Sequence, residues 1–554
     1  MPRLSTTLAI GLVVAACATA ARTGDTPSAP GGNAADWPAY NRTLAGDRFS
    51  PLSQIDRSNV TALRTVCSYA LPEVTDLQTG PVVVNGTIYF TSDTLTYAVD
   101  GGTCVERWRS ARRNTGRGGG VNRGVAYLDG KVFRGTYDSH VIALDAATGA
   151  RLWDVTLDVA GPGVSVPMAP VAWQGKVFIG NAGGDRVGVI GHVYALDARD
   201  GHVVWKFDVV PAAGPARSTW GRGAASAYPI TGGAFWTSFT LDEATGALYV
   251  AAGNPAPDFD AAVRDGENLY ANSIIALDAV TGRMLAYNQV VKHDFHDWDV
   301  DAPAPLVTTK AGRSIVASAN KDGLLSVLDR RGVGPNTPPA GDLPREMPLL
   351  FQTPTTTREN ADVPLSRDRK TRFCPGALGG SEWNGAAYDR DRNILFTGAA
   401  DWCSVVQLQP AAAAVPPVGQ SWFGNIGGFG QAMDSATKAR GWITAVDADN
   451  GTVRWKFAAP RPVLGGITPT AGGLLFAGDL SGAFYAFDAA SGGILWRTSF
   501  GQSVGGGVVS YCVSGQQRIA ATAGMRSALW ADASQSSRIV VLGLPAGTSR
   551  GGGC

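Results

Sequence analysis

Residues 143–153 read ALDAATGARLW. An aspartate in such a turn caps its own backbone, a glycine supplies positive φ, and the flanking apolar residues favour extended strands. The segment therefore predicts a β-hairpin that runs from Ala-x-Asp to a closing tryptophan.

The same pattern recurs along the chain. Copies begin at Ala98, Ala195, Ala445 and Ala486, and variants lie at residues 276–287 and around Leu328-Asp329. The aspartates are about forty to fifty residues apart, which is the length of a four-stranded propeller blade. Two longer gaps interrupt this spacing, and we expect further blades in them. The repeat predicts an all-β, eight-bladed propeller in which each closing tryptophan wedges neighbouring blades together. A stacked linear solenoid is the structural alternative, although solenoid repeats are usually shorter and more uniform.

Length and charge restrict the class of protein further. The chain has 554 residues, which exceeds one compact core and calls for several domains or for repetition. Charged residues make up only 17% of the chain and nearly balance, at a net charge of +1. This balance argues against nucleic acid as a partner.

The N-terminal region is typical of an exported protein. An apolar run at residues 8–16 is too short to span a bilayer, and it predicts a signal peptide over residues 1–20. The run ends at Cys17 in VAAC, which resembles a bacterial lipobox, whereas cleavage after Ala20 is the alternative. Both alternatives predict a flexible linker over residues 21–35 and a propeller over residues 36–554. We expect a periplasmic or secreted protein, either free or lipid-anchored through Cys17.

Six further cysteines suggest disulfides in an exported chain, and the sequence alone does not choose their pairing. They are Cys67, Cys104, Cys374, Cys403, Cys512 and Cys554. The sequence contains neither CxxC nor CxxCH, so it encodes neither a zinc site of that type nor a covalently attached haem.

Function must come from segments that the repeat does not require, because a non-catalytic propeller scaffold would carry the same repeat. Two such segments open and close the predicted propeller: DWPAYNRTLAGDRFSPLSQIDRSNVTALR at residues 36–64 and LGGITPTAGGLLFAGDLSGAFYAFDAASGGILW at residues 464–496. Both resemble the PQQ-dependent (quinoprotein) alcohol and glucose dehydrogenases, and the similarity runs from Asp36 to about Gly524. This resemblance implies a propeller enzyme that binds pyrroloquinoline quinone (PQQ) and a metal ion.

The most specific similarity lies in the middle of the chain. Residues 232–260 read GGAFWTSFTLDEATGALYVAAGNPAPDFD, and residues 293–303 read HDFHDWDVDAP. The resemblance implies that Trp236 stacks on the quinone plane, that Asn254 is a metal ligand, and that Asp299 is both the catalytic base and a ligand. A hard cation prefers oxygen ligands and a planar cofactor prefers an aromatic floor, so the residue types suit these roles. Taken singly, GNP reads as a turn and HDFHDWD as a solvated polar loop.

Three further residues gain roles from the resemblance. Arg123 in VNRGVAY corresponds to an arginine that contacts a PQQ carboxylate, a role that suits the planar guanidinium. Lys321 in SANKDGLLSVLDR corresponds to a Lys or Arg near the quinone oxygens. Asp185 is the candidate third metal ligand, although the family usually has the longer Glu there.

Two departures from the family pattern affect the expected site. Many relatives have adjacent cysteines that cover one face of PQQ, but this chain has RGGG at residues 117–120. In this respect the chain resembles the polyvinyl alcohol dehydrogenase and glucose dehydrogenase branches more than methanol dehydrogenase, and we expect a more open cofactor face. Asp301 matches the additional ligand of lanthanide-using methanol dehydrogenases, but glucose-type relatives also have an acid there. Calcium is accordingly our first choice of metal, with a lanthanide as the alternative.

The resemblance also concerns the cysteines. It implies a structural disulfide between Cys374 and Cys403, and we pair the remaining cysteines as Cys67 with Cys104 and Cys512 with Cys554.

The expected activity is the oxidation of an alcohol, with a secondary or polymeric alcohol such as polyvinyl alcohol favoured. Asp299 would remove the hydroxyl proton while hydride passes to PQQ. Electrons would then leave to a separate cytochrome c or quinone. A sugar dehydrogenase of the glucose type and a non-catalytic scaffold lipoprotein are the alternatives.

Overall fold

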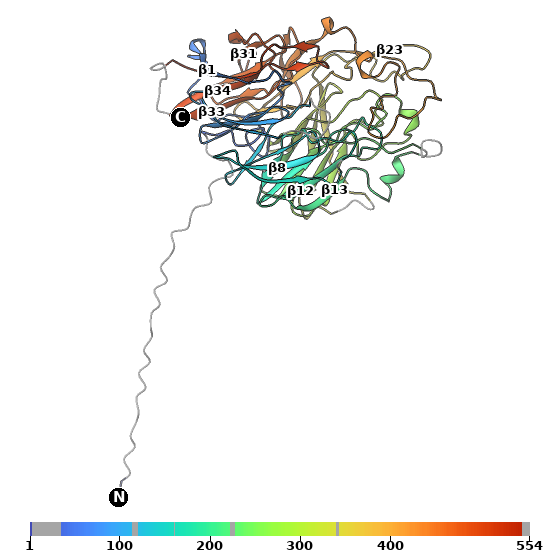
Figure 1. Ribbon diagram of the computed structural model, residues 1–554, viewed down its shortest axis with the longest axis horizontal. Helices are drawn as coiled ribbons and strands as arrows, with labels where there is room; N and C mark the ends of the chain where they lie inside the picture. The colour runs from blue at the N-terminus through green and yellow to red at the C-terminus, as the bar shows by residue number, and fades with distance from the viewer. Residues whose placement is uncertain (3–34, 113–119, 160, 222–227, 339–342, 546–553) are drawn as a thin grey trace.

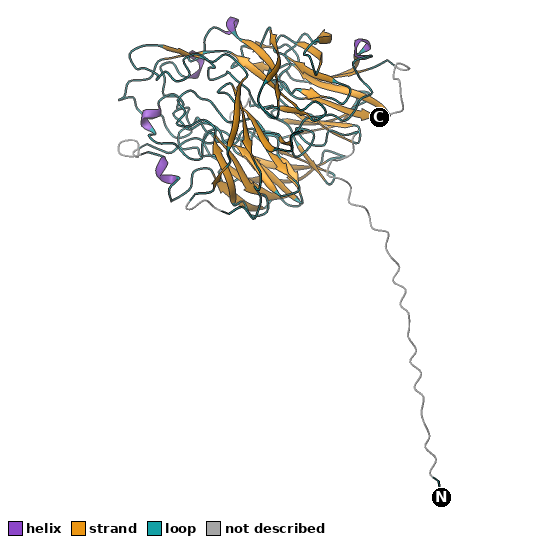
Figure 2. Ribbon diagram, turned by 180° about the vertical axis from the view of Figure 1, so that it is seen from behind, coloured by secondary structure: helices purple, strands orange, loops and turns teal. Residues whose placement is uncertain are grey.

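The computed structural model describes residues 1–2, 35–112, 120–159, 161–221, 228–338, 343–545 and 554. Eight sheets of four antiparallel strands form an eight-bladed propeller, as the repeat predicts, and a fifth strand is added in parallel to one of them. Figure 2 shows that strands dominate and that the helices are short. None of the described helices is long or apolar enough to cross a membrane.

The first four blades follow one another along the chain. Blade 1 is β2 (Val82–Val84), β3 (Thr87–Thr91), β4 (Leu95–Asp100) and β5 (Glu106–Ala111). Blade 2 is β6 (Ala126–Leu128), β7 (Lys131–Gly135), β8 (His140–Asp145) and β9 (Arg151–Thr156). Blade 3 is β10 (Val171–Trp173), β11 (Lys176–Gly180), β12 (His192–Asp197) and β13 (Val203–Asp208). Blade 4 is β14 (Thr240–Asp242), β15 (Ala247–Ala251), β16 (Ser273–Asp278), β17 (Met284–Gln289) and the added β21 (Arg345–Glu346).

The other four blades complete the ring. Blade 5 is β18 (Leu306–Thr308), β19 (Ser314–Ala319), β20 (Leu324–Asp329) and β22 (Leu349–Pro354). Blade 6 is β24 (Ala387–Asp389), β25 (Ile394–Asp401), β27 (Arg440–Asp447) and β28 (Val453–Ala459). Blade 7 is β29 (Thr468–Pro469), β30 (Leu474–Gly478), β31 (Ala483–Asp488) and β32 (Ile494–Ser499). Blade 8 is β33 (Val508–Val513), β34 (Gln516–Ala523), β37 (Arg538–Gly543) and β1 (Arg64–Ala70).

The remaining elements are small and lie between these strands. Two two-stranded sheets pair β23 (Thr371–Phe373) with β26 (Ser404–Val406) and β35 (Arg526–Ser527) with β36 (Asp532–Ala533). The described helices are 3-10 turns at η1 (Val60–Ala62), η2 (Arg217–Thr219), η4 (Ala261–Val263), η5 (Phe429–Gln431) and η6 (Ala436–Lys438).

Blade 8 closes the ring by combining the two ends of the chain. The N-terminal strand β1 pairs antiparallel with β37, and Figure 1 shows blue β1 beside red-orange β33 and β34. A disulfide between Cys67 on β1 and Cys104 in the β4–β5 turn joins blade 8 to blade 1. Cross-links of this kind stabilise a fold by about 2–4 kcal/mol. The expected pairs Cys374–Cys403 and Cys512–Cys554 also form.

The expectation that the two long gaps hold further blades is wrong. The gap after Asp197 contains the long β13–β14 and β15–β16 loops of blade 4, and the gap after Asp329 contains the loops around blade 6. The seven copies of the repeat account for seven blades. The eighth blade lacks the repeat because one of its strands comes from the N-terminal end of the chain.

The repeat forms hairpins as predicted, and its tryptophan joins adjacent blades. In the hairpin of blade 2, Asp145 Oδ1 accepts hydrogen bonds from the backbone N–H groups of the turn, at 3.1 and 2.9 Å. Trp108 of blade 1 donates its indole N–H to the carbonyl of Ala146 at 3.0 Å and packs against Gly149, whose φ is +72°. Trp153, Trp205 and Trp455 make the same pair of contacts with the next blade.

This contact explains the glycine of the repeat and gives a testable consequence. A Cβ on Gly149 would lie 2.6 Å from the Trp108 ring, whereas a Cβ on Gly130, with φ +74°, would meet nothing within 4 Å. We expect Gly130→Ala to lower the free energy of unfolding by about 1 kcal/mol through backbone strain alone. Gly149→Ala should cost about 1–3 kcal/mol more, because the indole must move. Urea denaturation of both variants measures the difference, and equal losses would show that the tryptophan contact does not hold the blades together.

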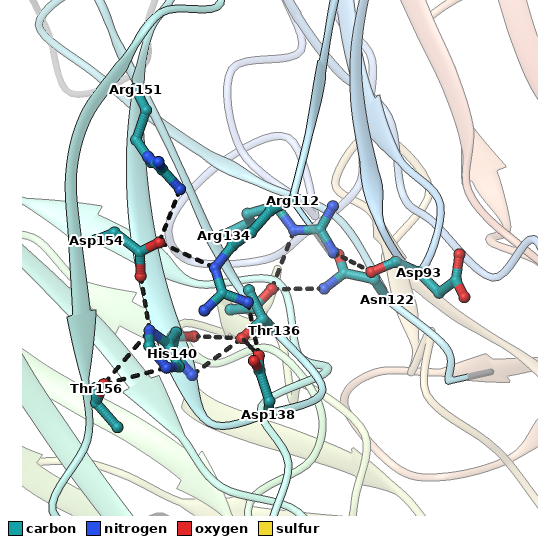
Figure 3. Close-up of polar contacts among 11 residues, drawn as sticks. Asp93, Arg112, Asn122, Arg134, Thr136, Asp138, His140, Arg151, Asp154 and Thr156 are labelled. Atoms are coloured by element: carbon teal, nitrogen blue, oxygen red, sulfur yellow. Dashed lines mark hydrogen bonds and ion pairs between the residues drawn. The ribbon is translucent and has the colours of Figure 1, made fainter. Parts of the chain in front are cut away.

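A polar network fixes the junction of blades 1 and 2 (Figure 3). Arg112, which follows β5, pairs with Asp138 at 2.7 Å and with Asp154 on β9 at 3.0 Å. Arg134 on β7 donates to the carbonyls of Asp93 and Leu95 in blade 1, at 2.6 and 2.9 Å. These charge-assisted contacts are largely buried, so they orient the two blades more firmly than exposed pairs would.

His140 in this network resembles the base of a catalytic triad, but its geometry is structural. His140 Nδ1 lies 2.7 Å from Asp154, and Thr156 Oγ1 lies 3.1 Å from Nε2 (Figure 3). The same hydroxyl is 3.4 Å from Nδ1. An oxygen nearly equidistant from both ring nitrogens does not lie along the lone pair of either one, so Thr156 is not aligned as a nucleophile.

Candidate active site

A cavity of about 340 Å³ lies among loops on one face of the propeller. Its walls come from loops that precede the first strand of a blade or join its second and third strands. Segments that interrupt the repeat therefore meet here, although they are far apart in the sequence. Six of the seven predicted site residues line the cavity: Arg123, Asp185, Trp236, Asn254, Asp299 and Lys321.

An aromatic floor and a guanidinium occupy one side of the cavity. The Arg123 guanidinium carbon lies 4.6 Å from the Trp236 ring centroid and 5.1 Å from that of Trp383. Arg123 is held by its backbone, since its N–H donates to Pro167 O and its carbonyl accepts from Gly80 N, both at 2.8 Å. A flat ring beside a fixed cation is suited to a planar, anionic ligand.

Asp299 is fixed by contacts to two other predicted residues. Its Oδ1 accepts from the backbone N–H of Asn254 at 2.9 Å, and its Oδ2 lies 2.7 Å from Lys321 Nζ. A Cβ on Gly253 would come within 2.4 Å of Oδ1, which explains the glycine of the GNP motif. The HDFHDWD run is buried at Asp294, His296, Asp297 and Asp299, so it is not a solvated loop.

Three acidic residues from different loops form a compact cluster beside Asp299. Asp185 lies in the β11–β12 loop, Asp258 in the β15–β16 loop and Asp297 in the β17–β18 loop. One carboxylate oxygen of each lies within 4.8 Å of the others. Asp185 also accepts a hydrogen bond from the Asn254 side chain. Asp258 and Asp297 are not among the residues predicted from the sequence.

The carboxyl groups of this cluster are destabilised in their ionised form unless a positive charge lies beside them. Burial, followed by the charge of Asp299, raises the pKa of Asp185 to about 6. Burial and neighbouring carboxylates raise the pKa of Asp258 and of Asp297 well above their ordinary values. Burial lowers the pKa of Lys321, but Asp297 and Asp299 outweigh it and hold that pKa well above its ordinary value. Lys321 is therefore charged, and the acids outnumber it.

Asp301 and Glu382 lie next to this cluster but outside it. Asp301 does not line the cavity, and burial, followed by the charges of Glu382 and Asp299, raises its pKa well above the ordinary value. Glu382 lines the cavity, and burial, the largest influence, raises its pKa to about 7. Glu382 is not among the residues predicted from the sequence.

These residues fit a bound cation and a planar cofactor. Both carboxylate oxygens of Asp258 and of Asp301, and Oε1 of Glu382, are buried without a hydrogen-bond partner among the described residues. Leaving ionised oxygens in this state is costly unless a cation compensates them. The oxygen-rich donor set is the type that calcium and lanthanide ions prefer.

Comparison with known proteins decides the family. Residues 37–338, more than half of the chain, match the family model described as "PQQ: Glucose/ethanol/alcohol dehydrogenase, beta-propeller domain". Residues 439–548, which cover the last blades, match a second model described as "Outer membrane protein assembly factor BamB". The chain belongs to the PQQ-dependent alcohol dehydrogenase family. It is thus a member of an enzyme family and not only a scaffold with the same repeat.

Individual relatives of this quinoprotein agree with that assignment. The chain is 31% identical to quinohemoprotein alcohol dehydrogenase ADH IIB of Pseudomonas putida, over 88% of this chain and 73% of the relative. It is 29% identical to the quinohemoprotein alcohol dehydrogenase of Comamonas testosteroni, over 88% and 72%. The solved structure of ADHIIG from Pseudomonas putida superimposes with a TM-score of 0.81 and 25% identity, over 92% of this chain and 80% of that one. A europium-containing methanol dehydrogenase, at 24% identity, shares the fold with a TM-score of 0.78 over 93% and 99%.

A long insertion of this quinoprotein, here called the cap segment (residues 407–439), covers one edge of the cavity. It runs from blade 6 to the loops that carry Asp185 and Asp258. Trp422 N–H donates to the Asp185 carbonyl at 2.7 Å, and Phe259 N–H donates to the Phe423 carbonyl at 2.9 Å. Phe423 and Phe429 of the cap segment line the cavity together with Leu529 and Trp530.

We expected an open cofactor face at residues 117–120, but only Gly120 of this segment is among the described residues. The signal peptide and linker also fall outside the described residues, apart from residues 1–2 and Ala35.

Proposed function

We propose that this quinoprotein oxidises an alcohol to an aldehyde or ketone, with PQQ as the hydride acceptor. The observation that carries this proposal is Asp299, a carboxylate held between Asn254 N–H and Lys321 at the wall of a cavity floored by Trp236. A general base must be fixed within reach of the proton that it removes, and the two contacts fix it.

The side chains around the cavity have distinct proposed roles. Arg123 would pair with a carboxylate of PQQ, Trp236 would stack on its ring, and Lys321 would lie near its carbonyl oxygens. Asp185, Asn254 and Asp299 would hold the metal ion, calcium in the first place or a lanthanide. Asp301 is the fourth proposed ligand, although it does not line the cavity. When bound, the two groups supply an electron-deficient carbonyl that accepts hydride and a Lewis acid that polarises it.

The chain's own residues perform the proton transfer and the charge stabilisation. Asp299 accepts the proton of the substrate hydroxyl as the carbon–hydrogen bond breaks, so the alcohol loses one proton and one hydride. Lys321, buried and charged, stabilises negative charge that develops beside it. Asp299 and Lys321 are buried, so water competes little with proton transfer to Asp299 or with the charge stabilisation by Lys321.

The finer proposal is a secondary or polymeric alcohol substrate. The rim formed by Phe423, Phe429 and Leu529 is apolar, and Leu529 is 56% exposed. Such a rim suits an alcohol with a hydrocarbon backbone, including polyvinyl alcohol, better than a sugar, because these three side chains offer sugar hydroxyl groups no polar partner. A glucose-type substrate remains the competing proposal, since the matching family model includes glucose dehydrogenases.

We propose in addition that electrons pass from the reduced cofactor to a cytochrome c or quinone outside the propeller. Three disulfides support a location outside the cytoplasm, periplasmic or secreted, with lipid attachment at Cys17 as one form of it.

A panel of alcohols tests the substrate proposal. The purified protein is incubated with PQQ and calcium, and dye reduction is followed with ethanol, 2-butanol, polyvinyl alcohol and glucose. We expect kcat/KM for 2-butanol to exceed that for glucose by at least about tenfold, because the apolar rim leaves sugar hydroxyls unpaired. Polyvinyl alcohol should also be oxidised. Faster oxidation of glucose than of every alcohol would contradict the substrate proposal and favour the sugar dehydrogenase.

A further inference from the structure

The metal ligands proposed above do not account for the acidic cluster of Asp185, Asp258 and Asp297. The three carboxylates converge from three different loops to within 4.8 Å of one another. Asp297 has a φ of +64°, a left-handed conformation that is uncommon for a residue other than glycine. Backbone of this kind persists where the surrounding structure requires the side chain in one place.

Asp258 is the member of the cluster that most clearly needs a ligand. It is completely buried, and neither of its carboxylate oxygens has a hydrogen-bond partner among the described residues. The neighbouring Arg264 does not satisfy it, because its guanidinium donates to the carbonyls of Pro257, Asp258 and Asp294 instead. A buried carboxylate in such a position is stable when it is paired with a cation or protonated.

The only lysine in the described walls of the cavity is already engaged. Lys321 Nζ lies 2.7 Å from Asp299 and 3.8 Å from Asp297. Asp185, Asp258, Asp297 and Asp299 together carry four negative charges when ionised, against the single charge of Lys321. A bound cation would offset the surplus of three negative charges that the ionised residues carry.

We infer that Asp258 and Asp297 are additional ligands of the metal ion, which they hold together with Asp185. This inference rests on the proposed function, since it concerns the same ion. Oxygen atoms from three carboxylates, with Asn254 and Asp299 adjacent, provide the number of ligands that a calcium or lanthanide ion takes. The metal site of this chain therefore contains more carboxylate ligands than the ligands proposed from the family resemblance.

The test is ion binding by the full-length protein, after treatment with a chelator and without PQQ. Terbium binding is followed by luminescence excited through tryptophan, because Trp298 lies between Asp297 and Asp299 in the sequence. Calcium binding is followed by competition with terbium. The variant is Asp258→Asn, which keeps the size of the side chain and one oxygen. The matched control is Asp76→Asn, which removes a carboxylate from the same cavity that is hydrogen-bonded to Gln78 at 3.0 Å.

The charge of the ion sets the expected result. The loss of one negative charge weakens the binding free energy in proportion to the charge of the ion. The logarithms of the fold changes in Kd for trivalent terbium and divalent calcium should therefore have a ratio near 3:2. We expect Asp258→Asn to raise the Kd of terbium about 100-fold and that of calcium about 20-fold. Asp76→Asn should change either Kd by less than about threefold.

Thermal unfolding gives an independent measurement, in which the variant should gain stability without metal although it loses affinity for the ion. Without metal, Asp258→Asn should raise the Tm slightly, by about 1–2 °C, because it removes a buried and unpaired carboxylate. With calcium, the stabilising shift in Tm should be smaller for the variant than for the wild type.

A Kd within about threefold of the wild type for both ions would overturn the inference, as would an equal loss in Asp76→Asn. Asp297→Asn is expected to give the same 3:2 relation, and it decides the matter where Asp258→Asn does not fold. The alcohol assay separates the two claims. Ion binding that depends on Asp258, without any alcohol oxidation, would refute the proposed function alone. Alcohol oxidation with unchanged ion binding in both variants would refute the inference alone.

Discussion

Replacement of Asp299 by asparagine is expected to lower the kcat for alcohol oxidation by about 10³-fold, because asparagine cannot accept the substrate proton. The substitution keeps the size of the side chain and can retain the contact to Asn254 N–H, so the cavity should keep its shape. Steady-state dye reduction at saturating PQQ and calcium measures the change. Saturation matters because Asp299 is also a proposed metal ligand.

The control for this variant is Asp479→Asn. Asp479 is also buried, but it lies in the β30–β31 turn of blade 7 and hydrogen-bonds to Ser481 and Tyr485, outside the cavity. We expect kcat within about threefold of the wild type for this control. A tenfold change in kcat corresponds to about 1.4 kcal/mol in the activation barrier. If kcat of Asp299→Asn stays within tenfold of the wild type, Asp299 is not the catalytic base.

Replacement of Lys321 by methionine is expected to affect both catalysis and stability. The variant keeps the length of the side chain but leaves Asp299 and Asp297 without their cation. Removal of one partner from a buried pair costs about 3–5 kcal/mol, so the Tm of the metal-free protein should fall. The loss of a charge-stabilising group should lower kcat/KM by about 10²-fold.

Calcium distinguishes the two effects of Lys321→Met. A cation bound by the acidic cluster restores positive charge, so calcium should recover part of the lost Tm but not kcat/KM. Lys310→Met is the matched control, because Lys310 is exposed and its ammonium contacts only the carbonyl of Asp391 among the described residues. An unchanged Tm and an unchanged kcat/KM in Lys321→Met would refute the role of this lysine.

The fold could be predicted from the sequence where its determinants are local. The hairpin of residues 143–153 carries its own turn chemistry in Asp145 and Gly149, and its tryptophan contacts the very next repeat. Blade 8 could not be found in this way, because β1 and β37 lie at opposite ends of the chain and share no motif. The long gaps were misinterpreted for a related reason, since the loops that build the cavity lack the periodic pattern by which strands are recognised.

The candidate site could be predicted where a motif fixed a residue type. Trp236, Asn254 and Asp299 stand in distinctive segments, and the structure brings them to one cavity. Asp258 and Asp297 were missed because an acidic residue in PDFD or HDFHD is indistinguishable from a solvated one in the sequence. Only the fold shows that both are buried and converge with Asp185.

Binding of PQQ in this cavity and its use in alcohol oxidation can be tested together in a single turnover without oxygen. Wild type and Asp299→Asn are loaded with PQQ and calcium, freed of unbound cofactor and mixed with 2-butanol, and the ketone formed is measured per protein molecule. We expect one ketone per bound PQQ in the wild type, and retained PQQ with almost no ketone in the variant. Failure of the wild type to retain PQQ with calcium or a lanthanide, or ketone formation without PQQ, would refute PQQ-dependent alcohol oxidation in this cavity.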